Sequence, residues 1–204
     1  MNQSVAKVLY VAGVTTFCTF LGCWAVLAHQ ENTPTKQERA RSGNNAYSNE
    51  GFIRNAAEGN MAEVKLGQLA QEKAQSPEVK KFAERMVNDH TKANEQLKQV
   101  ANQEHVNFPT DVNSKDATTY RTLEKLSGPE FDKAYARTMV RDHEKDVAEF
   151  KREASTAQTA PVKQYAQETL PTLESHLQEA KQMQAQVSRE GVGKGKASGG
   201  SSRR

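Results

Sequence analysis

The chain has 204 residues, which is the size of one domain with extensions rather than of two full domains. Aromatic residues make up only 6% of it, and Ala, Gln, Glu and Lys are abundant, as in helical proteins with long solvated faces. Its formal charge of +3 comes from the ends: removing Lys7 and residues 189–204, which hold five basic residues and one acidic residue, leaves 22 basic and 24 acidic residues. The core therefore has no basic face suited to binding nucleic acid.

Residues 1–28 differ in composition from the rest of the chain. Lys7 is their only charged residue, and an apolar run of about 21 residues follows it, long enough to span a bilayer. The run ends in Val26-Leu27-Ala28, residues of the kind that precede a signal-peptidase cleavage site. The segment is predicted to be either a signal peptide or an N-terminal membrane anchor. We therefore expect the protein in the periplasm or cell envelope, attached to the membrane through residues 1–28 if they are not cleaved.

Both cysteines, Cys18 and Cys23, lie in this segment. The stretch 20–23, Phe-Leu-Gly-Cys, weakly resembles a lipobox, so lipidation of Cys23 is a third alternative to cleavage and anchoring. A chain cleaved after Ala28 holds no cysteine, which excludes a disulfide, a thiolate metal site and a cysteine nucleophile.

The rest of the chain divides into a linker, a bundle and a tail. Residues 29–50 are polar and lack an apolar period, so they are predicted to be a linker. The folded bundle is predicted over 51–188, with helices at 52–75, 77–104, 114–126, 129–155 and from Pro161 onward. Residues 189–204, rich in Gly, Ser and Lys, are predicted to form a disordered basic tail.

Local signals support these helices. Ser76-Pro77-Glu78 combines an N-cap residue, a proline at the first helical position and an acid in the first turn. Pro171 falls inside the last helix, where the lost backbone hydrogen bond predicts a kink or bulge. Core positions recur at three- and four-residue steps along three helices: Val79, Phe82, Ala83, Met86, His90, Ala93, Leu97 and Val100; Phe131, Tyr135, Met139, His143, Val147 and Phe150; Val162, Tyr165, Thr169, Leu173, His176, Ala180 and Met183.

The order of these elements predicts the fold class. Two helices, a crossover of about 24 residues and two more helices are the connectivity of a ferritin-like four-helix bundle rather than of a simple up-and-down one. The short helix at 114–126 lies in the crossover, between helices two and three of the bundle. No stretch alternates with period two for long enough to predict a strand. The fold is therefore predicted to be all-α.

One seven-residue word occurs twice, as Met-Val-Asn-Asp-His-Thr-Lys at 86–92 and Met-Val-Arg-Asp-His-Glu-Lys at 139–145. Each copy places a histidine near the middle of a predicted helix, on its apolar side. A duplicated helix of this kind either brings imidazoles to the centre of a bundle or is a helix-packing solution used twice.

Four polar residues occupy mid-helix positions on the four long helices, namely Glu63, His90, His143 and His176. Mid-helix residues of antiparallel helices of similar length meet at one level, and buried polar groups need partners. Three imidazoles and a carboxylate would satisfy one transition-metal ion, such as zinc, iron, copper or nickel. A plain polar core network and a pH-sensitive histidine switch are the alternatives.

This set departs from known catalytic patterns. A di-iron carboxylate site needs Glu-x-x-His on two helices, but Val87, Val140 and Leu173 stand three residues before the histidines. The chain shows no Ser-His-Asp order, phosphate-cradling glycine loop or Cys-His pair. No catalytic or cofactor-binding residue is therefore predicted, and the sequence favours a protein that is not an enzyme.

Two aspartates adjoin the repeated histidines. Asp89 and Asp142 each lie about 100° around the helix from the next residue, so they are poorly placed to bind the same ion. They are predicted to have a structural or outer-shell role, paired with Lys or Arg of a neighbouring helix. Candidate partners are Arg85, Lys92, Arg141 and Lys145.

The segment from Phe52 to Leu177 resembles the exported bacterial bundles known as domain of unknown function 4142. The matching stretches are Glu58–Ala70, Val79–Lys92, Met139–Lys145 and Leu170–Leu177. The resemblance implies a ferritin-like, exported four-helix domain, often described as a membrane or outer-membrane protein. It implies no established activity.

The sequence thus predicts an exported, non-enzymatic helical bundle of the bacterial cell envelope, acting in stress tolerance. The alternative is a ferritin-like metal-binding protein that uses Glu63, His90, His143 and His176 to hold one transition-metal ion. No nucleic-acid partner is expected, and the sequence identifies no protein partner.

Overall fold

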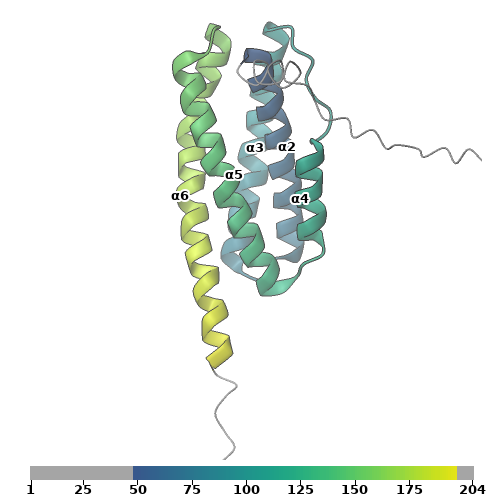
Figure 1. Ribbon diagram of the computed structural model, residues 1–204, viewed down its shortest axis with the longest axis vertical. Helices are drawn as coiled ribbons and strands as arrows, with labels where there is room; N and C mark the ends of the chain where they lie inside the picture. The colour runs from purple at the N-terminus through teal and green to yellow at the C-terminus, as the bar shows by residue number, and fades with distance from the viewer. Residues whose placement is uncertain (1–47, 197–204) are drawn as a thin grey trace, which may run out of the picture. The chain divides into compact units, whose positions relative to one another are not determined.

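The computed structural model describes residues 48–196, with side chains up to residue 189. This part contains five helices and no strand: α2 (Asn49–Lys73), α3 (Pro77–Gln103), α4 (Ser114–Glu124), α5 (Gly128–Thr156) and α6 (Ala160–Lys196) (Figure 1). The all-α prediction is confirmed. The predicted signal peptide or anchor and nearly all of the predicted linker lie outside the described residues. Within the described part, no helix has the length and apolar character needed to cross a membrane.

The helix boundaries lie within a few residues of the predicted ones, and the structure gives the reasons for the differences. α2 begins before residue 52 because Ser48 caps it: the Ser48 hydroxyl accepts the backbone N–H of Gly51 at 3.1 Å. α6 runs to Lys196, past residue 188, the predicted end of the bundle. It also continues as α-helix through Pro171, where a kink or bulge was predicted.

The turn between α2 and α3 is stabilised from another helix. Ser76 occupies the N-cap position of α3, as predicted, but its hydroxyl donates to Glu78 Oε2 at 2.8 Å and caps no backbone group. Instead, the backbone N–H groups of Gln75 and Ser76 donate to the two carboxylate oxygens of Asp132, at 3.1 and 2.8 Å. The buried Asp132 of α5 therefore fixes the turn, a tertiary contact that local sequence does not reveal.

The four long helices form two hairpins. Short turns make α2 antiparallel to α3 and α5 antiparallel to α6; α3 then packs against α6, and α2 against α5 (Figure 1). The connection from α3 to α5 carries α4, which lies along α2 and contacts α5. Gly67 lets α2 and α3 approach closely, since a Cβ atom there would lie 2.8 Å from Val87 Cγ2 and 2.9 Å from the Ala83 carbonyl oxygen.

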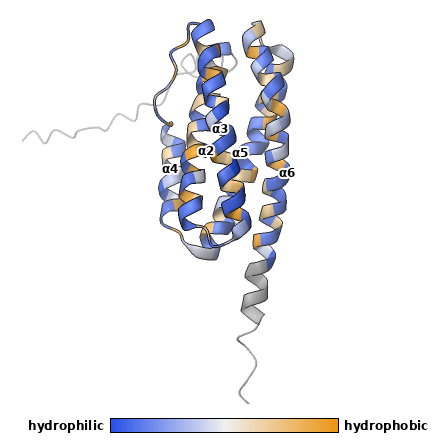
Figure 2. Cartoon of the chain, turned by 180° about the vertical axis from the view of Figure 1, so that it is seen from behind, coloured by the Kyte–Doolittle hydropathy of each residue, from blue (hydrophilic) through white to orange (hydrophobic). Residues whose placement is uncertain are grey.

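The core consists of two apolar clusters, one toward each end of the helices. One contains Phe82, Tyr135 and Met139, and the other contains Phe52 and Phe150, whose ring centroids are 5.0 Å apart. Each helix also carries hydrophilic residues along its length, as amphipathic helices of a bundle do (Figure 2). The predicted core positions on α5 are all buried, whereas near the end of α3 Ala101 is buried in place of the predicted Val100.

Candidate metal centre

The four mid-helix polar residues converge in the structure. Glu63 (α2), His90 (α3), His143 (α5) and His176 (α6), which we call the Glu/His cluster, are 3%, 2%, 0% and 0% exposed. Each belongs to the buried stripe of its helix, and the antiparallel packing brings the helix middles to one level. Every long helix therefore contributes one side chain to the cluster.

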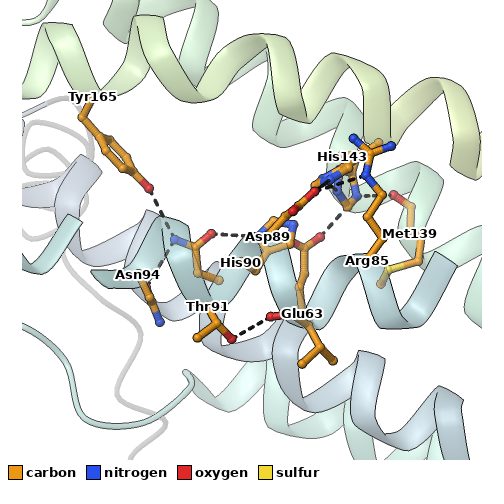
Figure 3. Close-up of polar contacts among 12 residues, drawn as sticks. Glu63, Arg85, Asp89, His90, Thr91, Asn94, Met139, His143 and Tyr165 are labelled. Carbon is orange, nitrogen blue, oxygen red and sulfur yellow. Dashed lines mark hydrogen bonds and ion pairs between the residues drawn. The ribbon is translucent and has the colours of Figure 1, made fainter. Parts of the chain in front are cut away.

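The members of the Glu/His cluster touch directly. Glu63 Oε2 lies 2.8 Å from His90 Nε2, and Glu63 Oε1 lies 3.2 Å from His143 Nδ1. His143 Nε2 lies 3.3 Å from His176 Nδ1. The three imidazole centroids are 5.3 to 5.6 Å apart. Figure 3 shows Glu63, His90 and His143 in the middle of this polar network, with Tyr165 at one end and Arg85 at the other.

Each imidazole also contacts a proton acceptor outside the cluster; in His143 it does so through Nδ1, the nitrogen that also lies 3.2 Å from Glu63 Oε1. The three pairs are His90 Nδ1 with Asn60 Oδ1 at 2.9 Å, His143 Nδ1 with the Met139 carbonyl oxygen at 3.0 Å, and His176 Nε2 with Asp89 Oδ2 at 2.9 Å. A carbonyl or carboxylate oxygen has no proton to give, so the ring nitrogen that faces it must be the N–H donor. In a neutral imidazole the remaining nitrogen then carries a lone pair.

The orientation of Asn60 follows from its own partners. The Tyr165 hydroxyl donates its single proton to the Ala93 carbonyl oxygen at 3.3 Å, so it can only accept from Asn60 Nδ2, 3.4 Å away. Asn60 Nδ2 also donates to Asn94 Oδ1 at 3.3 Å. The amide oxygen of Asn60 must therefore face His90, and His90 must present an unprotonated Nε2 to the cluster when it is neutral.

Three lone pairs thus converge beside a carboxylate. His90 Nε2, His143 Nε2 and His176 Nδ1 are the nitrogens left free of protons by the outer contacts. Although His90 Nε2 is only 2.8 Å from Glu63, neither carboxylate oxygen nor this nitrogen has a well-oriented hydrogen-bond partner among the described residues. Two acceptors at this distance need a positive charge between them, either a proton or a metal ion.

The protonation states at neutral pH suit a cation. Burial alone would raise the pKa of Glu63, but the charges that His143 and His90 carry when protonated outweigh it and hold this pKa at about 2. Burial lowers the pKa of His143 against the opposing attraction of Glu63, and burial together with His90 lowers the pKa of His176 to about 4. Glu63 is therefore an ionised carboxylate, and His143 and His176 resist protonation, which are the forms that bind metals.

The separations fit a single ion. With metal–nitrogen bonds of about 2.0–2.1 Å, neighbouring ligand atoms lie about 3.3 Å apart in a tetrahedral site and about 2.9 Å apart in an octahedral one. The contacts of 3.3 Å between His143 and His176 and of 2.8 Å between Glu63 and His90 are close to these two values. One ligand atom from each histidine lies within 4.8 Å of the other two.

The two aspartates beside the repeated histidines have different environments. Asp89 bonds His176 and also Arg85 of its own helix, with Arg85 Nε 3.1 Å from Asp89 Oδ2. Asp142 pairs with the adjacent Arg141 at 3.0 Å. Two of the predicted partners, Arg85 and Arg141, do pair with these aspartates, but each lies on the same helix as its aspartate rather than on a neighbouring one. The cross-helix partner of Asp89 is an imidazole.

Sequence reasoning missed the second contact of His90. Asn60 lies three residues before Glu63 on the same face of α2 and is 6% exposed, so a polar residue in the core stripe was the available signal. Tyr165 was predicted to lie in the core, but the hydrogen bonds of its hydroxyl group with Asn60 and the Ala93 carbonyl were not predicted. Of the two histidines excluded from the site, His105 is at the end of α3 with φ 55°, and His29 lies outside the described residues.

Comparison with known proteins identifies a family and a fold. Residues 33–183 match the profile of the family described as Domain of unknown function (DUF4142). No curated protein matches the chain. A DUF305 fragment from Deinococcus radiodurans has a similar solved structure, with TM-score 0.58 and 14% identity over 69% of this chain and 95% of the other. A DUF305 protein from Streptomyces coelicolor gives TM-score 0.60 and 15% identity over 70% and 94%.

At these identities the structural likeness shows a shared helical fold. The family match is more direct, because it covers most of the chain and includes every residue of the Glu/His cluster. It agrees with the resemblance drawn from the sequence stretches between Phe52 and Leu177. The chain belongs to the DUF4142 family, whose function is unknown.

Proposed function

We propose that this protein binds one transition-metal ion in the Glu/His cluster. The observation that carries the proposal is the set of contacts of the imidazoles: each donates to an acceptor outside the cluster, which leaves one lone pair on each of three ring nitrogens beside the Glu63 carboxylate. One ligand atom from each histidine lies within 4.8 Å of the other two. Metal-binding histidines in proteins show this arrangement, with one ring nitrogen on the ion and the other donating to a carboxylate, carbonyl or water.

The donor set narrows the choice of ion. Imidazole and carboxylate together suit zinc, copper, iron and nickel, whereas magnesium and calcium prefer sites made of oxygen ligands. The side chains of the cluster supply no thiolate or thioether, so the centre favours ions of intermediate softness. When bound, the ion would neutralise Glu63 and take up the three lone pairs, which removes the unsatisfied contacts of the cluster.

Burial favours holding an ion over transforming a substrate. Each member of the Glu/His cluster is at most 3% exposed, so a substrate larger than a few atoms cannot reach the ion while the helices are packed as described. We therefore propose metal binding or buffering, with no catalytic step. This role is compatible with a function in stress tolerance, since buffering limits the free concentration of a reactive ion.

The location and the finer fold assignment are part of the same proposal. Two antiparallel hairpins joined by a crossover that carries α4 support a ferritin-like bundle. The apolar segment at 1–28 supports export to the cell envelope. The Streptomyces coelicolor neighbour is itself named as a candidate secreted protein. Mass spectrometry of envelope fractions tests export, because a mature N-terminus at His29, an intact residue 1 or a diacylated Cys23 each identifies one processing route.

Elemental analysis tests the metal. The full chain is purified from its host without a His-tag, and bound metals are measured for the wild type, His143→Ala and His105→Asn. We expect close to one ion per chain in the wild type and in His105→Asn, and loss of the ion in His143→Ala. Less than about 0.1 ion per chain, with no change in melting temperature on adding zinc, copper, iron or nickel, would overturn the proposal. A proton shared by Glu63 and His90 would then account for the cluster.

A further inference from the structure

An ion can reach the buried Glu/His cluster only by passing between the helices. The residues that contact the three histidines from outside the cluster, Asn60, Met139 and Asp89, indicate where this path lies. Asn60 is 6% exposed, and Met139 is fully buried. The Asp89 side chain, by contrast, is 28% exposed while its Oδ2 atom is 2.9 Å from His176 Nε2. Of these three contacts, the one through Asp89 alone connects an imidazole to solvent.

The side chain of Arg85 covers Asp89 on the solvent side. Arg85 contacts Asp89 through Nε at 3.1 Å, and through Nη1 it pairs with Glu179 and bonds Ser175 Oγ at 3.2 Å. Asp89 and Arg85 belong to α3, whereas Glu179 and Ser175 belong to α6. Arg85 therefore bridges the two helices directly outside His176. Its side chain is 34% exposed, so it can leave this position toward solvent without unpacking the core.

A groove leads to the same place. A surface groove of about 510 Å³ lies between α3 and α6, and Arg85, Glu179, Phe82 and Met183 are among its lining residues. The ring of Phe82 is buried and packs on two members of the Glu/His cluster, with centroid distances of 6.4 Å to His143 and 6.5 Å to His176. One aromatic ring and one guanidinium group thus separate the groove from the imidazoles.

On the basis of the proposed metal binding, we propose that Arg85, Asp89 and Glu179 form the access gate of the Glu/His cluster. In the closed state, the guanidinium group neutralises two carboxylates. When Arg85 swings into solvent, Asp89 and Glu179 become an anionic mouth that attracts a cation, and the path beside Phe82 to His176 is open. The movement of Arg85 controls how fast an ion enters and leaves, whereas the affinity is determined by the four residues inside and by the contact of Asp89 with His176.

A second route must be distinguished from this one. A cavity of about 120 Å³ lies between α2, α4 and α5, and Asn60, Asp116 and Asp146 are among its lining residues. Its acidic residues would also attract cations. However, the amide group of Asn60 separates it from His90, and this amide is engaged by His90, Asn94 and Tyr165. The gate at Arg85 is closed by a partly exposed guanidinium group beside Phe82, with no buried hydrogen-bonded amide to displace, so we expect the ion to enter there.

The test compares exchange rates with affinity in the full chain. Stopped-flow measurements follow Co²⁺ uptake by its visible absorbance, and a chelator measures release, in Arg85→Met and the wild type. Methionine keeps much of the length of arginine and removes both ion pairs. We expect uptake and release to accelerate by about five- to tenfold each, with Kd changed less than about threefold, since exposed pairs of this kind are weak. Salt should slow uptake more in Arg85→Met than in the wild type, because two carboxylates are then uncompensated.

Two matched variants serve as controls. Arg141→Met breaks the comparable pair with Asp142, whose side chain forms no hydrogen bond with the Glu/His cluster, and should leave both rates unchanged. Asp116→Asn alters the second cavity and should also have no effect on them. Unchanged rates in Arg85→Met, faster release with a correspondingly weaker Kd, or a change confined to Asp116→Asn would each overturn the gate.

A readout without metal separates the gate from the proposed function. Diethyl pyrocarbonate acylates accessible imidazoles, and peptide mass spectrometry of the metal-free protein reports the reaction at His176. We expect faster acylation of His176 in Arg85→Met, with no change at the exposed His105. If the wild type binds no ion but this acceleration is seen, the proposed function fails and the access route stands. If ions bind but neither exchange nor acylation responds, the gate alone fails.

Discussion

Replacing His143 with alanine should destabilise the metal-free protein severely. The His143 side chain is fully buried, touches Glu63 Oε1 at 3.2 Å and His176 Nδ1 at 3.3 Å, and its ring packs 6.4 Å from the ring of Phe82. Removing it takes a neighbouring N–H group away from the buried Glu63 carboxylate, which leaves that charge less compensated and costs about 1–3 kcal/mol. The cavity left by the ring adds about 2 kcal/mol. We expect a loss of about 3–5 kcal/mol in the free energy of unfolding.

Urea denaturation followed by far-UV circular dichroism measures this loss, in buffer with a chelator so that no ion contributes. The matched control is His105→Asn, because His105 is exposed and asparagine tolerates its positive φ. It should cost less than about 0.5 kcal/mol. A double-mutant cycle with Glu63→Ala should be non-additive by at least about 0.5 kcal/mol, since the two residues share a contact.

Additive losses in the cycle would show that Glu63 and His143 do not interact. A loss at His105 as large as that at His143 would show that burial in the cluster has no special energetic weight. Either result would refute the reasoning from the contacts, and the repeated word would then be only a helix-packing solution used twice.

Three further predictions follow from other contacts. The metal-free protein should lose stability as pH falls from 7 to 5, because the pKa of His176 is about 4 in the folded state and about 6.5 in the unfolded chain. The unfolded chain therefore binds more protons in this range, and this histidine alone should lower the free energy of unfolding by about 2 kcal/mol. An unchanged or higher urea midpoint at pH 5 would contradict this expectation. Asp89→Asn should weaken metal binding on the order of tenfold in a competition titration, whereas Asp142→Asn should leave it unchanged. The reason is that the Asp89 carboxylate contacts an imidazole and the Asp142 carboxylate pairs with Arg141. Equal effects of the two variants would show that Asp89 does not support His176 as a metal ligand. Gly67→Ala should lower the free energy of unfolding in urea by about 1–3 kcal/mol, because the added Cβ atom would make short contacts with α3. Gly59→Ala has open space around its Cβ position and should be neutral or stabilising. The reverse order would contradict the packing of α2 on α3.

The helices could be predicted from sequence because their signals are local. Pro77 at a first helical position and the three- and four-residue spacing of apolar side chains act within one helix, so they hold whatever the helix packs against. The end of α3 shows the limit of this reasoning. Val100 and Ala101 are adjacent, and which of them is buried depends on the neighbouring helices rather than on the period.

The convergence of the Glu/His cluster could also be predicted, because antiparallel helices of similar length bring mid-helix residues to one level. Its outer contacts could not. The contact between Asp89 and His176 joins residues far apart in sequence, and it depends on how α3 and α6 are rotated about their axes. The two copies of the repeated word are alike, yet only one of their aspartates reaches an imidazole. Local sequence cannot distinguish them.

The distribution of the cluster over the helices has a consequence for assembly. The α2–α3 hairpin supplies Glu63 and His90, and the α5–α6 hairpin supplies His143 and His176, so neither half of the chain holds a full ligand set. An ion at this position would act as a reversible cross-link between the two halves and would be released when they separate. The free concentration of the ion would then determine how long the halves stay together. At one hundred times Kd, binding adds about 2.7 kcal/mol to the free energy of unfolding. In such a protein, the concentration of free metal would set how long the chain stays folded.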